Sequence, residues 1–289
     1  MSFVLTLNST NVSNTSTNTT FKYNFINGGF TCKDYEMCIS SITLPYSFYN
    51  VSSYYANKTF SLIFPTAATT IQYDVSLPDG FYTVTSINSY IQQICVSNGA
   101  YLIDSSGNNV YFIQLVYNTA YYSVQLLTFL VPNAIGTYTR PATGLYSTTG
   151  TGLPTVASTT KLVLASSGSI KSIIGFAAGT YPPTTETASW NTSSTVTPIG
   201  STVNSIIMRC SLISNRCTTP SDILDSMPIK DTSFGSNITY DPSFEKFISM
   251  SDGTYNNFTF TFMDQSLNEI YARDPNVSIT LIIRPKRNF

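Results

Sequence analysis

Short segments in which apolar and polar residues alternate recur along the chain, and they constrain its fold more than any other feature. Near the end, threonines separate Phe258, Phe260 and Phe262, and residues 277–283 repeat the alternation. Because successive side chains of a strand point to opposite faces, each segment predicts a strand with one buried face. The residues 274–276, Asp-Pro-Asn, predict a turn before the last strand. The predicted buried residues are Phe258, Phe260, Phe262, Ile279, Leu281 and Ile283.

Further strands are predicted throughout the chain from the same pattern. They cover residues 3–7, 21–26, 35–44, 59–65, 71–75, 161–165, 203–213, 237–240 and 244–250, and others begin at Tyr101, Val110 and Tyr122. From 132 to 198 the chain is rich in Thr, Gly, Ser and Pro, which predicts exposed loops around short strands, one of them over 170–176. Many short strands with few helices predict an antiparallel β-sandwich or barrel.

One helix is predicted between the strands. Apolar residues from Ile87 to Cys95 recur at helical spacing, which gives the segment a single apolar face. Thr85 or Ser86 would cap the start of this helix, and Gly99 would end it. The apolar face is expected to cover a sheet.

Charged residues make up 10% of the sequence, far below the roughly 25% of an ordinary soluble domain. The chain instead contains 20 Tyr and 18 Phe. A surface rich in Tyr and poor in Lys and Glu is typical of protein interfaces, although strands favour the same residues. Because the net charge is −1, no general attraction to nucleic acid or to anionic membranes is expected.

The two ends of the chain give no targeting or membrane signal. The first ten residues predict a strand and lack a cationic segment, so they are not interpreted as a signal peptide. No apolar run approaches the length that spans a membrane. Arg284, Lys286 and Arg287 are interpreted as a solvated terminus, because so few charges add little affinity for phosphate.

The sequence contains no histidine, which excludes His-dependent nucleophiles and His-ligated zinc sites. Paired carboxylates could act as acid and base, namely Asp34 with Glu36, Asp222 with Asp225, and Asp264 with Glu269 or Asp274. Simpler roles are favoured. A short helical turn is predicted over 220–228, where Asp222 and Asp225 would complement the helix dipole, and Asp264 and Asp274 flank a turn. No catalytic residue, metal site or cofactor site is predicted.

Cysteine and asparagine patterns bear on the compartment. The cysteines Cys32, Cys38, Cys95, Cys210 and Cys217 do not match zinc-binding spacings, and they are expected to be reduced, buried thiols of a protein made in a cytosol-like compartment. Asn-X-Ser/Thr sequons begin at Asn8, Asn11, Asn14, Asn18, Asn50, Asn57, Asn191, Asn237, Asn257 and Asn276. A chain so rich in Asn, Ser and Thr forms sequons by chance, so glycosylation is not expected. The single tryptophan, Trp190, either contacts a partner or sugar or packs locally.

Five stretches are distinctive in combination. They are YEMCISSITLPYSFYN (35–50), LPDGFYTVTSINSYIQQ (77–93), IIGFAAGTYP (173–182), PSDILDSMP (220–228) and the opening stretch of the chain. Together they resemble the penton, or minor capsid, proteins of virophages and polinton-like viruses. The matches keep their order and span most of the chain, whereas residues 8–20 and 143–160 carry no match.

This resemblance implies an all-β chain, a single jelly-roll sandwich with an inserted second β domain and one or two short helices. The jelly-roll strands would lie in residues 1–50 and 200–289, and the outward-pointing inserted domain would occupy 51–199. Five copies would close each five-fold vertex of an icosahedral virion whose faces are double-jelly-roll trimers. The implied partners are the homopentamer and the major capsid protein trimers, with other minor capsid proteins and a host receptor at the outer domain as further partners. The protein would be made in the host cytoplasm, and no active site is implied.

Two other functions remain open. An extracellular β-sandwich adhesin or lectin would use the sequons and Trp190, although the missing signal peptide speaks against it. A glycoside-cleaving β protein would use Asp264 and Glu269. Glycan occupancy after eukaryotic expression would distinguish the first, and loss of turnover in Asp264→Asn and Glu269→Gln would be required for the second.

Overall fold

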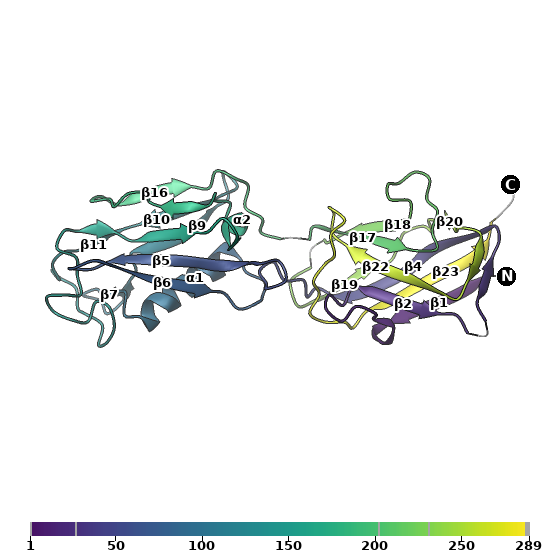
Figure 1. Cartoon of the computed structure of the whole chain (residues 1–289), viewed down its shortest axis with the longest axis horizontal. Helices are drawn as coiled ribbons and strands as arrows, with labels where there is room; N and C mark the ends of the chain where they lie inside the picture. Colours follow the sequence, from purple (N-terminus) through teal and green to yellow (C-terminus); the bar gives the residue numbers. More distant parts are fainter. Residues whose placement is uncertain (1, 27, 202, 231, 287–289) are drawn as a thin grey trace. The chain divides into compact units, whose positions relative to one another are not determined.

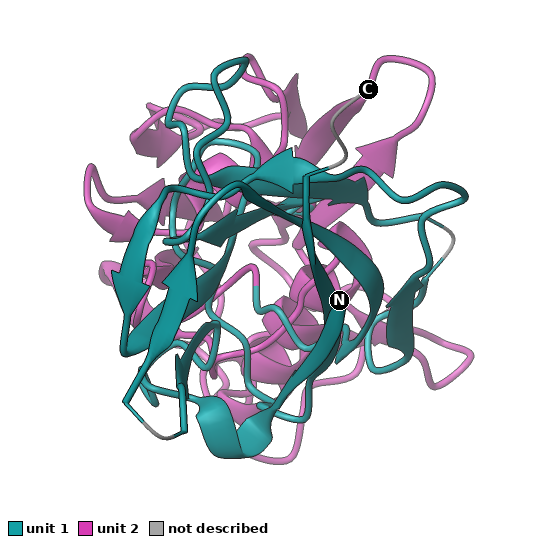
Figure 2. Ribbon diagram, turned by 90° about the vertical axis from the view of Figure 1, so that its right-hand side faces the viewer, with its two compact units in different colours: residues 1–49, 201–289 teal, residues 50–200 magenta. Residues whose placement is uncertain are grey.

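The computed structural model describes residues 2–26, 28–201, 203–230 and 232–286, so Arg287 of the basic terminus lies outside the described residues. The chain forms two compact units, coloured separately in Figure 2. Unit 1 consists of residues 1–49 and 201–289, and unit 2 consists of residues 50–200. Unit 2 is therefore continuous in sequence and is inserted into unit 1.

Unit 1 contains two antiparallel sheets (Figure 1). The first has the order β1 (Phe3–Asn8), β23 (Ser278–Pro285), β4 (Tyr35–Pro45) and β19 (Asn237–Tyr240), and β20 (Ile248–Ser249) also pairs with β4. The second has the order β18 (Ile223–Pro228), β17 (Ser205–Cys210), β22 (Asn257–Met263) and β2 (Thr20–Asn24). A small ladder joins β3 (Phe30–Cys32) to β21 (Gly253–Tyr255), and a 3₁₀ turn covers Ser9–Asn11.

The order of these strands is that of a jelly roll. If β1, β2, β4, β17, β18, β19, β22 and β23 are numbered one to eight along the chain, the sheets read 1-8-3-6 and 5-4-7-2. Most consecutive strands thus lie in opposite sheets, as two interlocked Greek keys require. The predicted all-β jelly-roll class is confirmed, and unit 2 is inserted between the third and fourth strands.

The core of unit 1 lies between these sheets and contains the predicted residues. Phe258, Phe260 and Phe262 of β22 are at most 1% exposed, and the three apolar residues predicted from β23 are at most 2% exposed. The ring of Phe262 lies 5.8 Å from that of Phe21 and 5.3 Å from that of Phe260, both edge to face. Because β22 and β23 belong to different sheets, the last two strands close the sandwich from its two sides.

Unit 2 is a second β structure with its own core. One sheet has the order β14 (Gly168–Ser169), β5 (Asn57–Pro65), β13 (Lys161–Leu164) and β15 (Gly179–Tyr181), with β6 (Thr70–Ser76) also on β5. The other has the order β16 (Trp190–Ser193), β10 (Ser123–Thr128) and β9 (Ile113–Asn118). Two short ladders pair β7 (Leu102–Ile103) with β8 (Asn109–Val110) and β11 (Leu130–Val131) with β12 (Ser158–Thr159).

The predicted helix is α1 (Val84–Ser97), and it packs against β9 with Ile87, Ile91 and Cys95 buried. Its cap is Thr83, two or three residues before the predicted Thr85 or Ser86, because Thr83 and Ser86 form a reciprocal capping box. Gly99 follows the helix at φ +60°, and a Cβ there would lie 2.1 Å from the carbonyl oxygen of Thr143. Only glycine fits this close approach.

Two local predictions are wrong. Residues 220–228 form no helical turn, because β18 pairs with β17, and this ladder satisfies the backbone groups that a helix would have used. Residues 170–176 form no strand, because α2 (Lys171–Ile174) makes one helical turn that Gly175 ends at φ +74°. In addition, the strand predicted over 244–250 is limited to β20.

Candidate functional sites

The carboxylates of Asp222, just before β18, and of Asp225, within β18, serve to hold unit 1 together. Arg209 on β17 binds the Asp222 carboxylate through Nε and Nη2, with the shortest contact at 2.7 Å. Asp225 accepts hydrogen bonds from the Tyr240 hydroxyl at 2.5 Å and from Lys246 Nζ at 3.1 Å. Burial, followed by the Asp225 carboxylate, raises the pKa of Tyr240, so its hydroxyl remains a donor. Both carboxylates are therefore committed to partners within the fold.

In each of the other carboxylate pairs, at least one member has a local structural partner. Asp264 Oδ1 accepts the backbone N–H groups of Ser266 and Asn268, each at 2.8 Å, and so shapes the turn after β22. Asp274 Oδ1 accepts the backbone N–H of Asn276 at 2.9 Å. At the start of β4, Glu36 accepts from Arg284 Nε at 2.7 Å. These contacts are those of turns and strand ends rather than of an acid–base pair.

The cysteines form no cluster. All five are free, and Cys32, Cys38, Cys95 and Cys210 are buried, whereas Cys217 is exposed and contradicts the expectation of a buried thiol. Cys217 follows β17 in the connection to β18, where no sheet covers it. Burial raises the pKa of Cys95 and of Cys210 to about 12, which keeps these thiols protonated and unreactive. Among the described residues, no group of three or more Cys, Asp or Glu could hold a metal ion.

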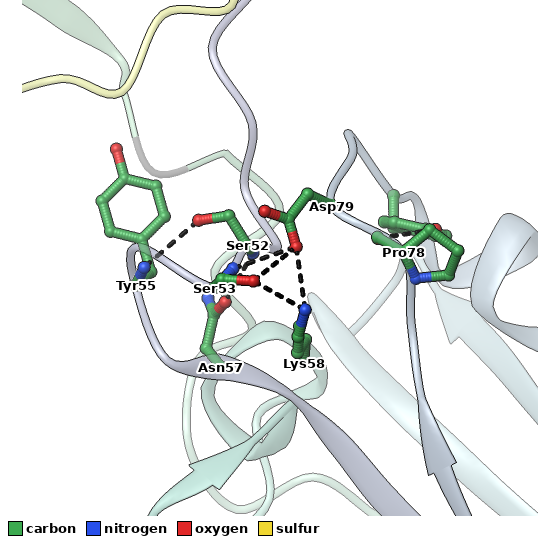
Figure 3. A network of polar contacts seen from close by, with 8 residues as sticks. Ser52, Ser53, Tyr55, Asn57, Lys58, Pro78 and Asp79 are labelled. Atoms are coloured by element: carbon green, nitrogen blue, oxygen red, sulfur yellow. Dashed lines mark hydrogen bonds and ion pairs between the residues drawn. The ribbon is translucent and has the colours of Figure 1, made fainter. Parts of the chain in front are cut away.

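A polar network fixes the loop that begins unit 2 (Figure 3). Lys58 Nζ donates to Ser53 Oγ at 2.6 Å and to Asp79 Oδ1 at 3.1 Å, and Asp79 also accepts from the Ser53 backbone N–H at 3.0 Å. Partial burial acts to raise the pKa of Asp79, but the hydrogen bonds from Lys58 and Ser53 outweigh it and lower that pKa. Because Asp79 holds the Lys58 ammonium as an ion pair, the amine is not free to activate the serine.

Asn50 ties together the two ends of unit 2. Its side chain is fully buried, and Nδ2 donates to the carbonyl oxygens of Tyr82 at 2.8 Å and Gly200 at 3.0 Å. Oδ1 accepts the backbone N–H of Tyr82 at 2.7 Å, and Asn57 Nδ2 bonds the Asn50 carbonyl at 2.8 Å. This Asn begins a sequon, yet its amide is enclosed and fully used in the folded unit. The asparagine of this sequon therefore has a structural role and needs no glycan to account for it.

Trp190 has a packing role in unit 2. It is partly buried against the core of that unit, and its carbonyl oxygen accepts a hydrogen bond from Thr128 Oγ1 at 3.2 Å. Of the two interpretations of this residue, local packing is the one that its contacts support.

The open depressions of the two units differ in character. In unit 1, a volume of about 740 Å³ lies between residues 214–217, residues 247–252 and Lys286. It is open to solvent, and its lining includes Cys217, Asp252 and Lys286. In unit 2, a smaller groove of about 260 Å³ lies beside Tyr117 and Tyr122, which are 38% and 60% exposed.

No described helix is long and apolar enough to span a bilayer.

Comparisons with known proteins give a likeness in structure but no match in sequence. No family model matches this sequence, and no curated protein matches it. The crystal structure of the selenomethionine-labelled mavirus penton protein matches 99% of this chain and 100% of its own, with a TM-score of 0.41 and 9% identity. At that score and identity the match is a distant resemblance and does not by itself assign a function.

Proposed function

We propose that this chain is a structural capsid protein, the penton subunit that closes the five-fold vertices of an icosahedral virion. The observation that carries the proposal is the strand order of unit 1 together with the position of unit 2. An eight-stranded jelly roll interrupted between its third and fourth strands by a separate β unit is an arrangement suited to a shell. The sequence stretches that resemble penton proteins support it independently of that arrangement.

The low charge of the chain is in keeping with a subunit enclosed by neighbours. Charged residues are 10% of the sequence, and the ion pairs Arg209–Asp222, Lys246–Asp225 and Arg284–Glu36 occupy several of them inside unit 1. A subunit that stayed free in solution would need more charge on its surface to resist association. At least one carboxylate of each pair considered as catalytic has a structural partner, which favours an assembly role over an enzymatic one.

The partners follow from the same proposal. The chain would assemble as a homopentamer and contact the surrounding trimers of the major capsid protein, and other minor capsid proteins would adjoin it. Unit 2 would be the outer domain, the part of the subunit that a host receptor would reach.

Protein stoichiometry in purified virions tests this proposal. Quantitative mass spectrometry of intact particles should give five copies of this chain for every capsid vertex, with the major capsid protein in large excess. A copy number that instead tracks the number of face trimers, or the absence of the chain from particles that package normally, would refute the penton assignment.

A further inference from the structure

The two lateral edges of the jelly roll differ in their protection against association. One edge is formed by β1 and β2, and the other by β18, β19 and β20. Natural sheets protect exposed edges with charges, prolines or irregular segments. The second edge has all three, since β18 contains Asp225 and ends at Pro228, and the irregular charged segment 241–247 lies between β19 and β20. On the first edge, β2 carries the charge of Lys22, but β1 has no charge, no proline and no break in its pairing, so β1 is the unprotected strand.

The unprotected strand β1 presents apolar side chains. Val4 on the outward face of β1 is 70% exposed, and Phe3 is 41% exposed. The Phe3 ring lies 6.1 Å from the ring of Phe30 and 6.4 Å from that of Tyr35, so it belongs to an aromatic cluster at the rim of the sandwich. We call Phe3 and Val4 the β1 patch. A patch on a bare strand edge is a place where another chain can pack.

The opposite edge presents the aromatic side chain of Phe244, on a segment held in place by ion pairs. Phe244 is 65% exposed. Its neighbour Lys246 is tied to Asp225 of β18, and Lys246 Nζ lies 5.7 Å from the centre of the Phe244 ring. Further along, the Arg284 guanidinium lies 3.3 Å from the centre of the Phe247 ring. A side chain held out by a fixed segment loses little entropy when it is buried by a partner.

The two apolar features lie at the same height on the sandwich. Through the intervening strand β23, the pairing registers place Val4 level with Cys38 of β4. On the other edge of β4, Tyr240 pairs with Ile42 and Ile248 pairs with Met37. The segment 241–247, which joins these two residues, therefore spans the level of Cys38. When opposite edges meet at equal height, neighbouring copies are related by a rotation without a shift along the strands. Such a contact can close into a ring.

The charges of the two edges are complementary. Lys22 on β2 is the first charged side chain of the sequence and is exposed, and Asp241 beside β19 is also exposed. Neither forms an ion pair within the described part of the chain. The edge of β1 and β2 thus carries a free cation as well as an apolar patch, and the other edge carries a free carboxylate on the same segment as Phe244.

From these observations we infer that copies of this chain associate edge to edge, with Phe244 of one copy packed on the β1 patch of the next and Asp241 facing Lys22. The occupant of each edge is a second copy, because apolar residues and opposite charges meet only when the two different edges are brought together. The inference rests on the proposed penton function, and it identifies which surfaces of the subunit form the seam.

A zero-length carbodiimide reaction on purified particles tests the contact directly. It should join Lys22 of one copy to Asp241 of another and produce a ladder of multimers up to the pentamer, and Lys22→Gln or Asp241→Asn should remove the linked peptide. Because both side chains are exposed, neither change is expected to affect folding. Linkage from Lys22 or from the segment 241–247 to the major capsid protein would overturn the inference and assign that edge to the trimers.

Substitutions in the seam add a functional readout. Val4→Lys and Phe244→Asp should each lower vertex occupancy about tenfold, since a charge would be buried at an apolar contact. Val156→Lys in unit 2 is the matched control, because Val156 is 62% exposed and should be neutral. Lys22→Glu and Asp241→Lys should each weaken assembly, and their combination should restore it. Normal vertices in both seam variants would overturn the seam but leave the penton role intact, whereas wild-type particles without this chain at the vertices would refute the penton role itself.

Discussion

Replacing Phe260 with alanine tests how the second sheet of unit 1 faces its partner. The Phe260 side chain is fully buried, and its ring lies 5.3 Å from that of Phe262. Its strand is central in the sheet, with Cys210 of β17 opposite on one side and Phe21 of β2 on the other. Neighbours on both sides prevent the surrounding backbone from closing over the space that a missing ring would leave.

The magnitude follows from two contributions. Burial of a phenylalanine side chain contributes about 1.5–3 kcal/mol of transfer free energy. An unfilled cavity adds about 24 cal/mol for each Å³ that remains, which brings the usual total for such a substitution to about 3–5 kcal/mol. We expect Phe260→Ala to lose about that much of the free energy of unfolding of unit 1, toward the upper end because the site is enclosed on both sides.

Urea unfolding with two probes measures this loss. Trp190 is the single tryptophan and lies in unit 2, so its fluorescence follows unit 2, while circular dichroism follows the whole chain. Phe260→Ala should move the transition of unit 1 and leave the Trp190 transition nearly unchanged. Thr261→Ala, on the opposite face of the same strand, should cost about 1 kcal/mol or less. If Phe260→Ala loses little stability and Thr261→Ala loses much, Phe260 does not point into the core as assigned. A one-residue shift in register would give that result.

Three further predictions concern thiols, buried polar groups and pH. Without denaturant, a small alkylating reagent should modify Cys217 rapidly and the four buried cysteines slowly, whereas all five should react after unfolding; mass spectrometry that finds a protected Cys217 would contradict its exposure. Asn50→Ala should destabilise unit 2 by about 2–3 kcal/mol, because the Tyr82 N–H and two carbonyl oxygens lose their partner, and the Trp190 transition should report it. Since the pKa of Asp79 is lowered, the stability that its carboxylate contributes is complete above about pH 4 and lost as the pH falls further; acid should destabilise unit 2 less in Asp79→Asn, and equal acid sensitivity would refute the role of the ion pair.

Strand faces and the main helix could be predicted from the sequence because they depend on local periodicity. The alternation of Phe258, Phe260 and Phe262 identifies their buried face without any knowledge of the partner strand. The position of the helix follows in the same way from the spacing of Ile87 and Cys95. The predicted helix cap, Thr85 or Ser86, lies after the observed cap, Thr83. Threonine is an equally good cap at 83 and at 85, and the choice between them depends on the loop before the helix.

Features that depend on pairing between distant segments could not be predicted. The segment 220–228 has the residues of a helix start, but β17 provides a ladder for it, and Arg209 provides the partner for Asp222. The exposure of Cys217 depends likewise on where the sheet ends. The lateral edges could not be recognised either, because Val4 and Phe244 are unremarkable in sequence until the strand order places them on opposite edges at one height.

The measurement that tests the central claim most directly is a localised electron cryomicroscopy reconstruction at the vertices of intact particles. The proposal predicts five copies of this chain around each five-fold axis, with the β1 edge of one jelly roll against the segment 241–247 of the next. Density that fits this chain only between face trimers, or vertices occupied by a different protein, would contradict it.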